Sequence, residues 1–329
     1  MRNEIMLSRV ADSLYWMARY LERADHVARQ LDVHLSISPE QASEAAQRRR
    51  RRLVTTLIGE YFSDGRAQSD FELVNLLTFD EANPNSILHC IGIARDNARQ
   101  VREQIDPQMW EQINQLYLAL QNASLASIWQ GQPHHFYHGI NQDVYRFQGI
   151  TDARMGRDQG WHFIQLGRHI ERSIQTADSI NIDFRELYRA GVEASSTDQA
   201  TYLEWVGLLR GCAAYDAYRR LYTAALQPRY IVELLLLNSD FPYSVHFGIN
   251  TIQSSLDGLG RMTGTHKSAR VYRLAGRLRA MLDFGHVDEI MAGGLGSYLL
   301  DIQQQCSQIH QAIYQTYVTY PVAEKLPTG

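Results

Sequence analysis

The sequence LYWMARYLERADHVARQL, residues 14–31, decides the fold class. Its apolar residues recur every three or four positions, which is the spacing of one buried stripe on an α-helix. The stripe extends from Leu7 to Leu35, about eight helical turns. No segment of the chain alternates convincingly between apolar and polar residues, as a half-buried strand would. The sequence therefore predicts an all-α protein, built as a multi-helix bundle.

The same spacing predicts helices along the rest of the chain. Ser38-Pro39-Glu40 is typical of a helix start, with a capping Ser, a Pro at the first position and an acid in the first turn. The further predicted helices cover residues 86–104, 108–130, 134–156, 160–188, 198–224, 228–238, 243–256, 266–283 and 295–318.

The composition is that of a protein with a large buried core, since 45% of the 329 residues are hydrophobic and 21% are charged. A formal net charge of −4 provides no general attraction for nucleic acid or anionic lipid, so we expect neither as a partner. Of the 32 basic residues, 30 are Arg, whose planar guanidinium suits buried ion pairs and anion recognition. Codon usage in a GC-rich genome is the alternative explanation of this excess.

Cysteine usage and hydropathy indicate the compartment. Cys90, Cys212 and Cys306 are far apart and odd in number, which argues against a disulfide framework and against a thiolate metal site. The N-terminal segment is interrupted by charges, and no uncharged run reaches the ~18 residues of a membrane span. The most apolar stretch, IVELLLLN at 231–238, is short enough to be a core helix. We therefore expect a cytoplasmic protein without a membrane span, metal or cofactor.

A second segment, FIQLGRHIERSIQTADSI at 163–180, repeats the first at an offset of 149 residues. The apolar stripes coincide, and the charged triplet of the first segment falls on that of the second. Each segment is followed by a Pro-x-Ser sequence, in NPNSIL at 83–88 and in FPYSVH at 241–246, where Ser can cap the next helix. We interpret this order as an internal duplication within a single domain, 1–329, with halves of approximately 1–158 and 159–329.

Each of the two helices also carries a strip of polar residues beside its apolar stripe. The strips consist of Tyr15, Arg19, Glu22, His26 and Arg29 in the first helix, and of Ile164, Arg168, Glu171, Gln175 and Asp178 in the second. The spacing brings Arg19 close enough to pair with Glu22, whereas Arg23 lies farther round the helix. If both helices are central, the two Arg-Glu units meet in the middle of the bundle.

Two interpretations of these charges remain open. They form an ion-pair network that fixes the register of the helices, because buried charges must be paired. Alternatively they form a site for an anion or carboxylate, in which one Glu orients an amine. The arginines of that site would be Arg19, Arg23, Arg168 and Arg172, and the glutamate Glu22 or Glu171.

The chain resembles the alpha-E domain family, a bacterial group named for its helices and its Glu-Arg motif. The resemblance rests on five ordered segments: MLSRVADSLYWMARYLERADHVARQLDV (6–33), NPNSILHCIGIARDNARQVRE (83–103), GWHFIQLGRHIERSIQTADSI (160–180), LLRGCAAYDAYRRLY (208–222) and LLLLNSDFPYSVHF (234–247). Such domains are encoded beside, or fused to, a circularly permuted ATP-grasp amide ligase, often with transglutaminase-like or proteasome-like hydrolases. The resemblance therefore implies a peptide or amide-forming pathway.

What the family implies for this chain is an accessory or substrate-binding role with an ATP-grasp ligase, on a peptide or an amino-acid carboxylate. The family's motif residues correspond here to Arg19, Glu22, Arg23, Arg168, Glu171 and Arg172, with Arg95, Asn97, Arg99 and Arg102 in a further helix. One departure is the pair Asp25-His26, where many relatives are expected to have Glu-Asn. Two alternatives are a stand-alone enzyme that uses Glu22 or Glu171 as general acid or base, and a purely structural scaffold. Whether the chain is an enzyme stays open.

Four further features each have a functional and a plain interpretation, and we favour the plain one. The run QRRRRR at 47–52 is either a nucleic-acid patch or a solvated helix face. His134, His135 and His138 have metal-ligand spacing but no Cys or Glu-x-x-His nearby, so we expect ordinary histidines.

The third feature is a basic stripe, Arg270, Arg273 and Arg277 with His266, for which we expect acidic partners on neighbouring helices. The fourth, GGLGS at 293–297, has no Walker lysine and is interpreted as a loop and helix start. No familiar nucleophile motif is present in the sequence.

Overall fold

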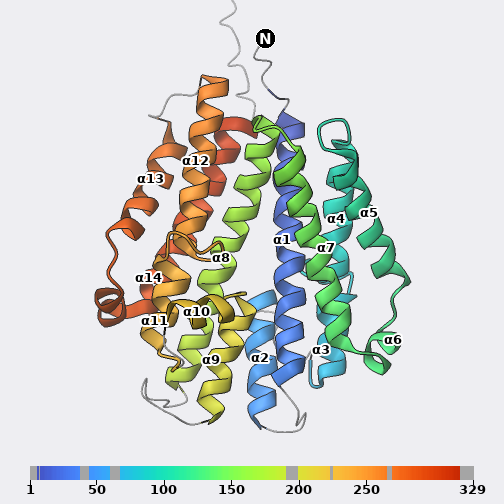
Figure 1. Ribbon diagram of the computed structural model, residues 1–329, viewed down its shortest axis with the longest axis vertical. Coiled ribbons are helices and arrows are strands. Elements are labelled where there is room, and N and C mark those ends of the chain that lie inside the picture. Colours follow the sequence, from blue (N-terminus) through green and yellow to red (C-terminus); the bar gives the residue numbers. More distant parts are fainter. Residues whose placement is uncertain are drawn as a thin grey trace, which may run out of the picture.

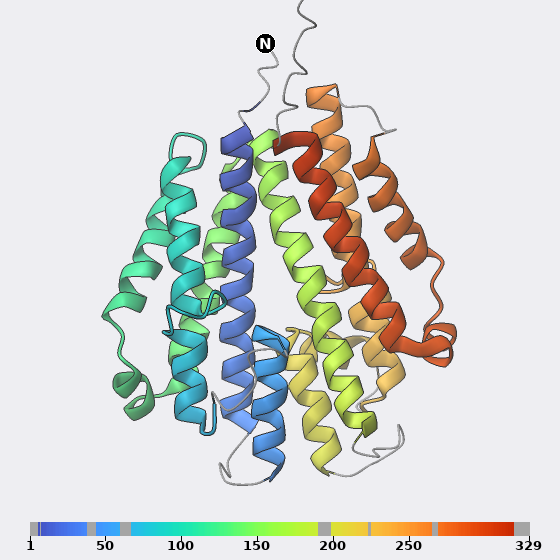
Figure 2. The same cartoon turned by 180° about the vertical axis from the view of Figure 1, so that it is seen from behind.

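The computed structural model describes residues 6, 8–37, 44–59, 67–189, 199–222, 225–264 and 269–318. Within these ranges every regular element is a helix, which confirms the predicted all-α class. Two long helices, α1 (Ser8–Ile37) and α8 (Gln159–Arg189), lie side by side in the middle of the molecule, and the other helices surround them (Figures 1 and 2). No helix in the described ranges is long and apolar enough to cross a membrane.

The apolar stripes are the reason that α1 and α8 lie at the centre. Leu14, Met17 and Leu31 of α1 are completely buried. The two backbones approach closely at Gly167 of α8, where a Cβ atom would lie 2.2 Å from the carbonyl oxygen of Tyr15. Only glycine permits this approach, since a carbonyl oxygen in a helix cannot move aside as a flexible side chain can.

Among the described residues, six α-helices follow α1 in the first half of the chain and six follow α8 in the second. The first set is α2 (Glu44–Ile58), α3 (Asp70–Thr78), α4 (Ile87–Gln100), α5 (Pro107–Asn122), α6 (Leu125–Gln130) and α7 (Pro133–Arg154). The second set is α9 (Gln199–Gly211), α10 (Tyr215–Leu221), α11 (Pro228–Val232), α12 (Val245–Thr263), α13 (Arg270–Asp283) and α14 (Val287–Ile313), with π-helical segments at Glu233–Leu237 and Tyr314–Val318.

The helices of the two halves contact one another in the same order. Helix α1 packs against α4 and α7, with α5 contacting both; α8 packs against α12 and α14, with α13 contacting both. In addition α2 contacts α8, while α9 contacts α1, so each half also packs on the central helix of the other. The common order is what a duplication would leave, although the duplication itself stays a prediction.

The two Pro-x-Ser sequences begin equivalent helices. Ser86 caps α4 by accepting a hydrogen bond from the backbone N–H of His89, and Ser244 caps α12 by accepting one from Phe247. Capping by the side-chain oxygen satisfies an amide that has no partner within the helix. The predicted helix starts are thereby confirmed.

Some predicted helices differ from those observed. The segment 108–130 is two helices, because Ala123 is extended and Ser124 caps α6. The segment 198–224 is also divided, at Ala213, whose φ of 51° interrupts the helix. Helix α3 was not predicted, although Ser69 and Glu72 form a capping box at its start.

The GGLGS sequence was only partly understood. It lies within α14, and Gly294, with a φ of 104°, interrupts the helix there, so that a second helical stretch begins after Gly294, where a helix start was predicted. The predicted start at Ser38-Pro39-Glu40 lies outside the described residues, which begin again at Glu44.

Candidate functional site at the crossed Arg-Glu motifs

The two Arg-Glu motifs pair with each other across the contact between α1 and α8. Glu171 accepts hydrogen bonds from Nε of Arg19 and from Nε of Arg23, both at 2.7 Å. In the other direction, Glu22 accepts from Nε of Arg172 at 2.5 Å and from its Nη2 at 2.8 Å. The predicted pairing of Arg19 with Glu22 inside one helix was therefore wrong. Each glutamate therefore accepts hydrogen bonds from arginine of the opposite helix, and these ion pairs hold α1 and α8 together.

These pairs are withdrawn from water. The side chains of Arg172 and Glu22 are 3% and 1% exposed, and those of Arg19 and Glu171 are 9% and 6% exposed. Burial alone would raise the pKa of Glu171, but Arg19 and Arg23 outweigh burial and hold that pKa below its ordinary value. Glu171 is consequently ionised at neutral pH and poorly suited to accept a proton as a general base.

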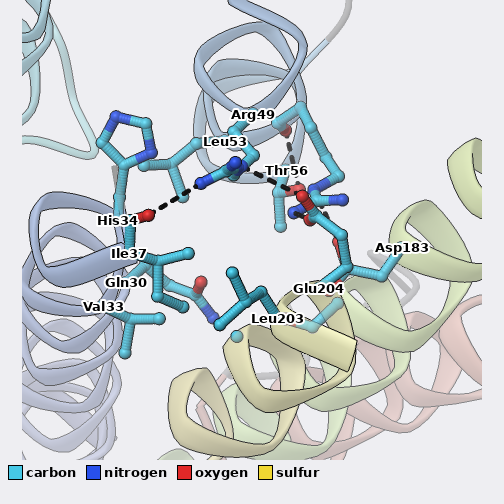
Figure 3. Close-up of a pocket in the computed structure, with 13 residues that line it drawn as sticks. Gln30, Val33, His34, Ile37, Arg49, Leu53, Thr56, Asp183, Leu203 and Glu204 are labelled. Carbon is cyan, nitrogen blue, oxygen red and sulfur yellow. Dashed lines mark hydrogen bonds and ion pairs between the residues drawn. The ribbon is translucent and has the colours of Figure 1, made fainter. Parts of the chain in front are cut away.

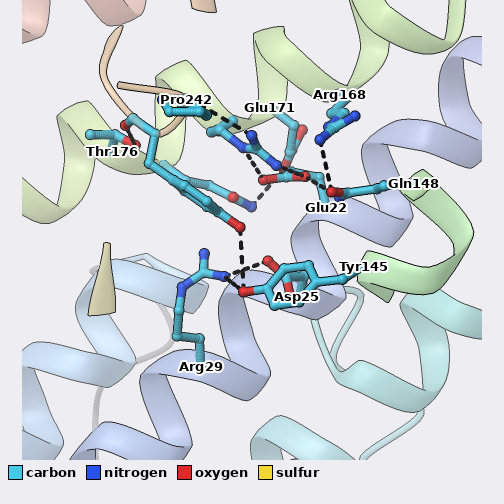
Figure 4. A network of polar contacts seen from close by, with 12 residues as sticks. Glu22, Asp25, Arg29, Tyr145, Gln148, Arg168, Glu171, Thr176 and Pro242 are labelled. Atoms are coloured by element: carbon cyan, nitrogen blue, oxygen red, sulfur yellow. Dashed lines mark hydrogen bonds and ion pairs between the residues drawn. The ribbon is translucent and has the colours of Figure 1, made fainter. Parts of the chain in front are cut away.

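Arg168 is the member of the motifs that has no buried carboxylate. Its Nη2 donates to Oε1 of Gln148 at 2.8 Å (Figure 4). Its Nη1 lies 3.6 Å from Asp152, which is half exposed. The same Gln148 donates to Glu22 at 3.3 Å and so links Arg168 to the crossed pairs. Nε of Arg168 is buried without a hydrogen-bond partner among the described residues. Burial and the neighbouring Arg172 lower the pKa of Arg168.

An aromatic side chain, Tyr243, closes the network beside Arg172. The guanidinium of Arg172 lies 4.1 Å from the centre of the Tyr243 ring, and that of Arg29 lies 4.8 Å from it. Arg29 also pairs with Asp25 and donates to the carbonyl oxygen of Gly211 at 2.8 Å. Guanidinium groups over aromatic faces gain a cation–π attraction. On this side the two guanidiniums are covered by the ring of Tyr243, a side chain of the protein itself.

Beside the pair of Arg23 with Glu171, by contrast, the protein leaves an unfilled space. A cavity of about 230 Å³ lies there, between α1, α2, α8 and the segment before α4. Its polar lining includes Arg23, His26, Thr56, Asn85, Glu171 and Asp178. Arg23 is more exposed than Arg19 and Arg172, the other arginines of the crossed pairs, and its Nη1 donates to Oδ1 of Asn85 at 3.0 Å.

Two groups that line this cavity lack the partners that buried polar groups normally have. Asp178 accepts a hydrogen bond from Gln303 at 2.6 Å, but no cation pairs with it among the described residues. Burial and the neighbouring Glu171 raise the pKa of Asp178 to about 7. His26 is buried, and its Nε2 has no hydrogen-bond partner in the described part of the chain. Burial and Arg29 lower the pKa of His26 to about 3, so this imidazole is neutral.

Thr56 also lines a second, smaller cavity of about 40 Å³, whose lining Figure 3 shows. Arg52 pairs there with Asp183 at 2.8 Å and with Glu204 at 2.5 Å. Burial raises the pKa of Asp183 to about 6, against the opposing effect of Arg52. The charged side chains that line this cavity pair with one another, so they offer a ligand fewer unpaired charges than the first cavity does.

The arginine run that contributes Arg52 is not the solvated face that we expected. Arg50 is buried and binds Asp70 at 3.0 Å, and Arg49 pairs with Glu204 at 3.0 Å. Arg48 and Arg51 are exposed. The inward arginines fix α2 to its neighbours, which the sequence alone could not indicate because the acidic partners are distant in the chain.

Other predicted site residues do not join the crossed motifs. Arg95 binds Asn114 and lies over the rings of Trp110 and Tyr117, while Arg99 is exposed and pairs with Asp96 at 3.2 Å. Arg95 thus contacts α5 and Arg99 lies on the exposed side of α4, so neither is placed at the crossed motifs with the other predicted ligand-binding arginines.

The histidines and the basic stripe lie at the surface. His134, His135 and His138 are exposed, and His134 pairs with Asp32. No group of three or more metal-ligating side chains is gathered in the described ranges. Arg270 and Arg277 are exposed on α13, and the acidic partners expected for them are not found among the described residues. His266 lies outside those residues.

The crossed motifs agree with the comparison to known families. A family model named Alpha-E, a predicted alpha-helical domain with a conserved ER motif, matches residues 6–318. The chain belongs to the Alpha-E family. Uncharacterized proteins of Mycobacterium bovis and Mycobacterium tuberculosis are similar to this Alpha-E chain, each 21% identical over 316 residues. The match covers 89% of this chain and 34% of each relative, so the chain spans about a third of their length. No solved structure matches the Alpha-E chain.

Sequence reasoning missed the most distinctive group of the site, Asp178. The residue was placed on the polar strip of its helix, but nothing in the local sequence showed that it would lack a cation. Its counterpart at the 149-residue offset is Arg29, an opposite charge. A departure of this kind between two otherwise matching strips is the signal that could have drawn attention to it.

Proposed function

We propose that this Alpha-E chain is an accessory or substrate-binding protein of a peptide or amide-bond-forming system, acting with an ATP-grasp ligase. In this proposal the cavity beside Arg23 and Glu171 holds the terminus of an amino acid or peptide. The observation that carries the proposal is Asp178, a half-buried carboxyl that lines the cavity and has no cationic partner among the described residues. A carboxylate that is partly withdrawn from water is stabilised by a counter-charge, and a ligand amine would provide one.

The rest of the lining suits the same ligand. A peptide terminus carries a carboxylate or carbonyl within a few bonds of its amine. Arg23, with its guanidinium at the cavity, is a donor for such an oxygen. Of the four arginines expected to bind a ligand, Arg23 alone lines this cavity, so the proposed ligand role narrows to Arg23.

The link to a ligase rests on the family resemblance and is tested directly. The measurement is binding and amide-forming turnover of the ATP-grasp protein encoded nearest to this gene, with wild type, Asp178→Asn and the surface control Asp96→Asn. We expect wild type and Asp96→Asn to stimulate turnover and folded Asp178→Asn to bind the ligase without stimulating it. Wild-type protein that neither binds nor stimulates the ligase would refute the proposal.

A second candidate, a purely structural scaffold, is favoured by the complete pairing of Glu22 with Arg172. Under that function, variants of either motif lower stability and change nothing else. The third possibility, a stand-alone enzyme using Glu22 or Glu171, has less support, because Glu171 is held ionised by two arginines. Turnover by the isolated chain, lost in folded Glu171→Gln, would restore it.

A further inference from the structure

The cavity has a counterpart in the other half of the molecule, and that counterpart is filled by Tyr243. Three residues that line the cavity, Arg23, Glu171 and Asp178, each have an equivalent on the other central helix. At the offset of 149 residues the equivalents are Arg172, Glu22 and Arg29. The Tyr243 ring lies over the guanidiniums of Arg172 and Arg29, and burial, with the charges of Asp25 and Glu22, raises the pKa of its phenol.

The residue between Pro and Ser in each Pro-x-Ser sequence determines whether the space beside the motif arginine is empty or occupied by a side chain. In the first half this residue is Asn85, whose amide oxygen accepts from Nη1 of Arg23 at 3.0 Å. In the second half it is Tyr243, where Nη1 of Arg172 donates to the carbonyl oxygen of Pro242 at 3.2 Å. The motif arginine therefore meets the Pro-x-Ser segment in both halves. An asparagine is too short to fill the volume that a tyrosine ring fills in the other half.

The size of the cavity fits a ring. An engineered cavity of about 150 Å³ in another protein binds benzene, and the present cavity, at about 230 Å³, has room for a ring and a short polar chain. The cavity and its counterpart at Tyr243 differ in one charge. The counterpart contains the cation Arg29, and the equivalent residue at the cavity is the acid Asp178. A ligand in the cavity must therefore bring its own cation.

We propose that the ligand of this cavity is an aromatic amino acid, free or at the N-terminus of a peptide, with its ring on the guanidinium of Arg23 and its amine at Asp178. The Tyr243 ring on Arg172 is the protein's own version of this arrangement. The proposal rests on the proposed function, which it narrows from any peptide terminus to an aromatic one.

Two amines of nearly equal size, one aromatic and one saturated, test whether the cavity prefers an aromatic ring. The measurement is calorimetric binding of 2-phenylethylamine and 2-cyclohexylethylamine to the full chain, with the dipeptide Ala-Ala as a non-aromatic terminus. A cation–π contact is worth about 0.5–2 kcal/mol, so we expect phenylethylamine to bind roughly 2- to 30-fold more tightly than cyclohexylethylamine. Phenylalanyl-alanine should exceed Ala-Ala by a similar factor.

Variants place the binding in the cavity. Asn85→Tyr should fill the cavity and abolish phenylethylamine binding, whereas Tyr243→Asn should leave that binding unchanged. If Asn85→Tyr does not fold, Asp178→Asn serves instead. It keeps the side-chain size and an acceptor for Gln303, and should weaken both amines by at least tenfold.

The outcomes separate this inference from the function on which it rests. Equal binding of the two amines, or of the two dipeptides, overturns the inference that the ligand is aromatic, but it does not contradict the proposal that the cavity binds a peptide terminus. Binding of Ala-Ala alone does the same. Failure of all four compounds to bind overturns both. Phenylethylamine binding that survives in folded Asn85→Tyr places the site elsewhere and overturns the inference.

Discussion

Replacing Glu22 by Gln tests whether the crossed pairs hold the two central helices together. The substitution keeps the shape of the side chain and removes its charge. It leaves the guanidinium of Arg172, which is 3% exposed, without a carboxylate. Breaking a buried pair by removal of one partner costs about 3–5 kcal/mol.

The structure places this substitution near the lower end of that range. Arg172 keeps a hydrogen bond to the carbonyl oxygen of Pro242 and the face of Tyr243, and the Gln oxygen still accepts one of the two bonds that Glu22 accepted. We therefore expect a loss of about 3 kcal/mol in the free energy of unfolding. At roughly 2 °C per kcal/mol for a large chain, the melting temperature falls by about 6 °C.

Urea unfolding is the appropriate assay, because an uncharged denaturant does not screen the pair. The control is Asp96→Asn, which removes a carboxylate from an Arg in the same way. Its partner Arg99 and Asp96 itself are 61% and 50% exposed, so the loss should be below about 1 kcal/mol. The double variant Glu22→Met with Arg172→Met should recover part of the loss, since no charge is left stranded.

The reasoning would be refuted by a Glu22→Gln protein within about 1 kcal/mol of wild type. The single variants Glu22→Met and Arg172→Met complete the cycle. The reasoning would also be refuted by a double variant that loses the sum of these two single losses, because the pair would then have no interaction energy.

Other substitutions test the packing and the cavity. Gly167→Ala should destabilise the protein by about 1–3 kcal/mol in urea, as its Cβ would meet the Tyr15 carbonyl, whereas Gly149→Ala, with open space, should stabilise it by about 0.5–1 kcal/mol. Ser86→Ala should lower stability by about 1 kcal/mol by removing a helix cap. The pKa of Asp178 is about 7 in the folded protein, above its ordinary value of 3.8, so its stabilising contribution is complete below pH 3.8 and lost as pH rises through 7. Asp178→Asn should therefore exceed wild type in stability at pH 8, by a difference that shrinks as pH falls; equal stability at pH 8 contradicts this. Binding of amines to wild type should strengthen as pH rises through about 7, where Asp178 ionises, and a flat profile would exclude Asp178 from the site.

The fold was accessible from the sequence to the extent that it depends on local periodicity. The stripe from Leu7 to Leu35 and the caps at Ser86 and Ser244 were sufficient to place α1, α4 and α12. Short elements were not: α3 has nine residues, too few for a periodic pattern, and the break at Ala213 depends on a backbone conformation that its sequence does not demand.

The site was accessible only in part, because it depends on contacts between distant segments. The repeat identified the Arg-Glu motifs, but helical spacing suggested the wrong partner for Arg19, since the crossing of two helices is not encoded in either one. The isolation of Asp178 depends on four segments that meet around it. Its near-neutral pKa is a property of that assembly, and no single segment carries a sign of it.

The crossed pairing also has a consequence for the order in which the chain is made. Arg23 binds a carboxylate that lies 148 residues later in the sequence. At synthesis rates of about 5–20 residues per second, Glu171 leaves the ribosome roughly 7–30 s after the helix that needs it. During this interval α1 has neither its ionic partner nor the contacts of α8 and α9 over its apolar face. Until α8 and α9 are synthesised, part of the apolar surface of α1 therefore stays uncovered. We expect the nascent chain to be most prone to aggregation during this interval.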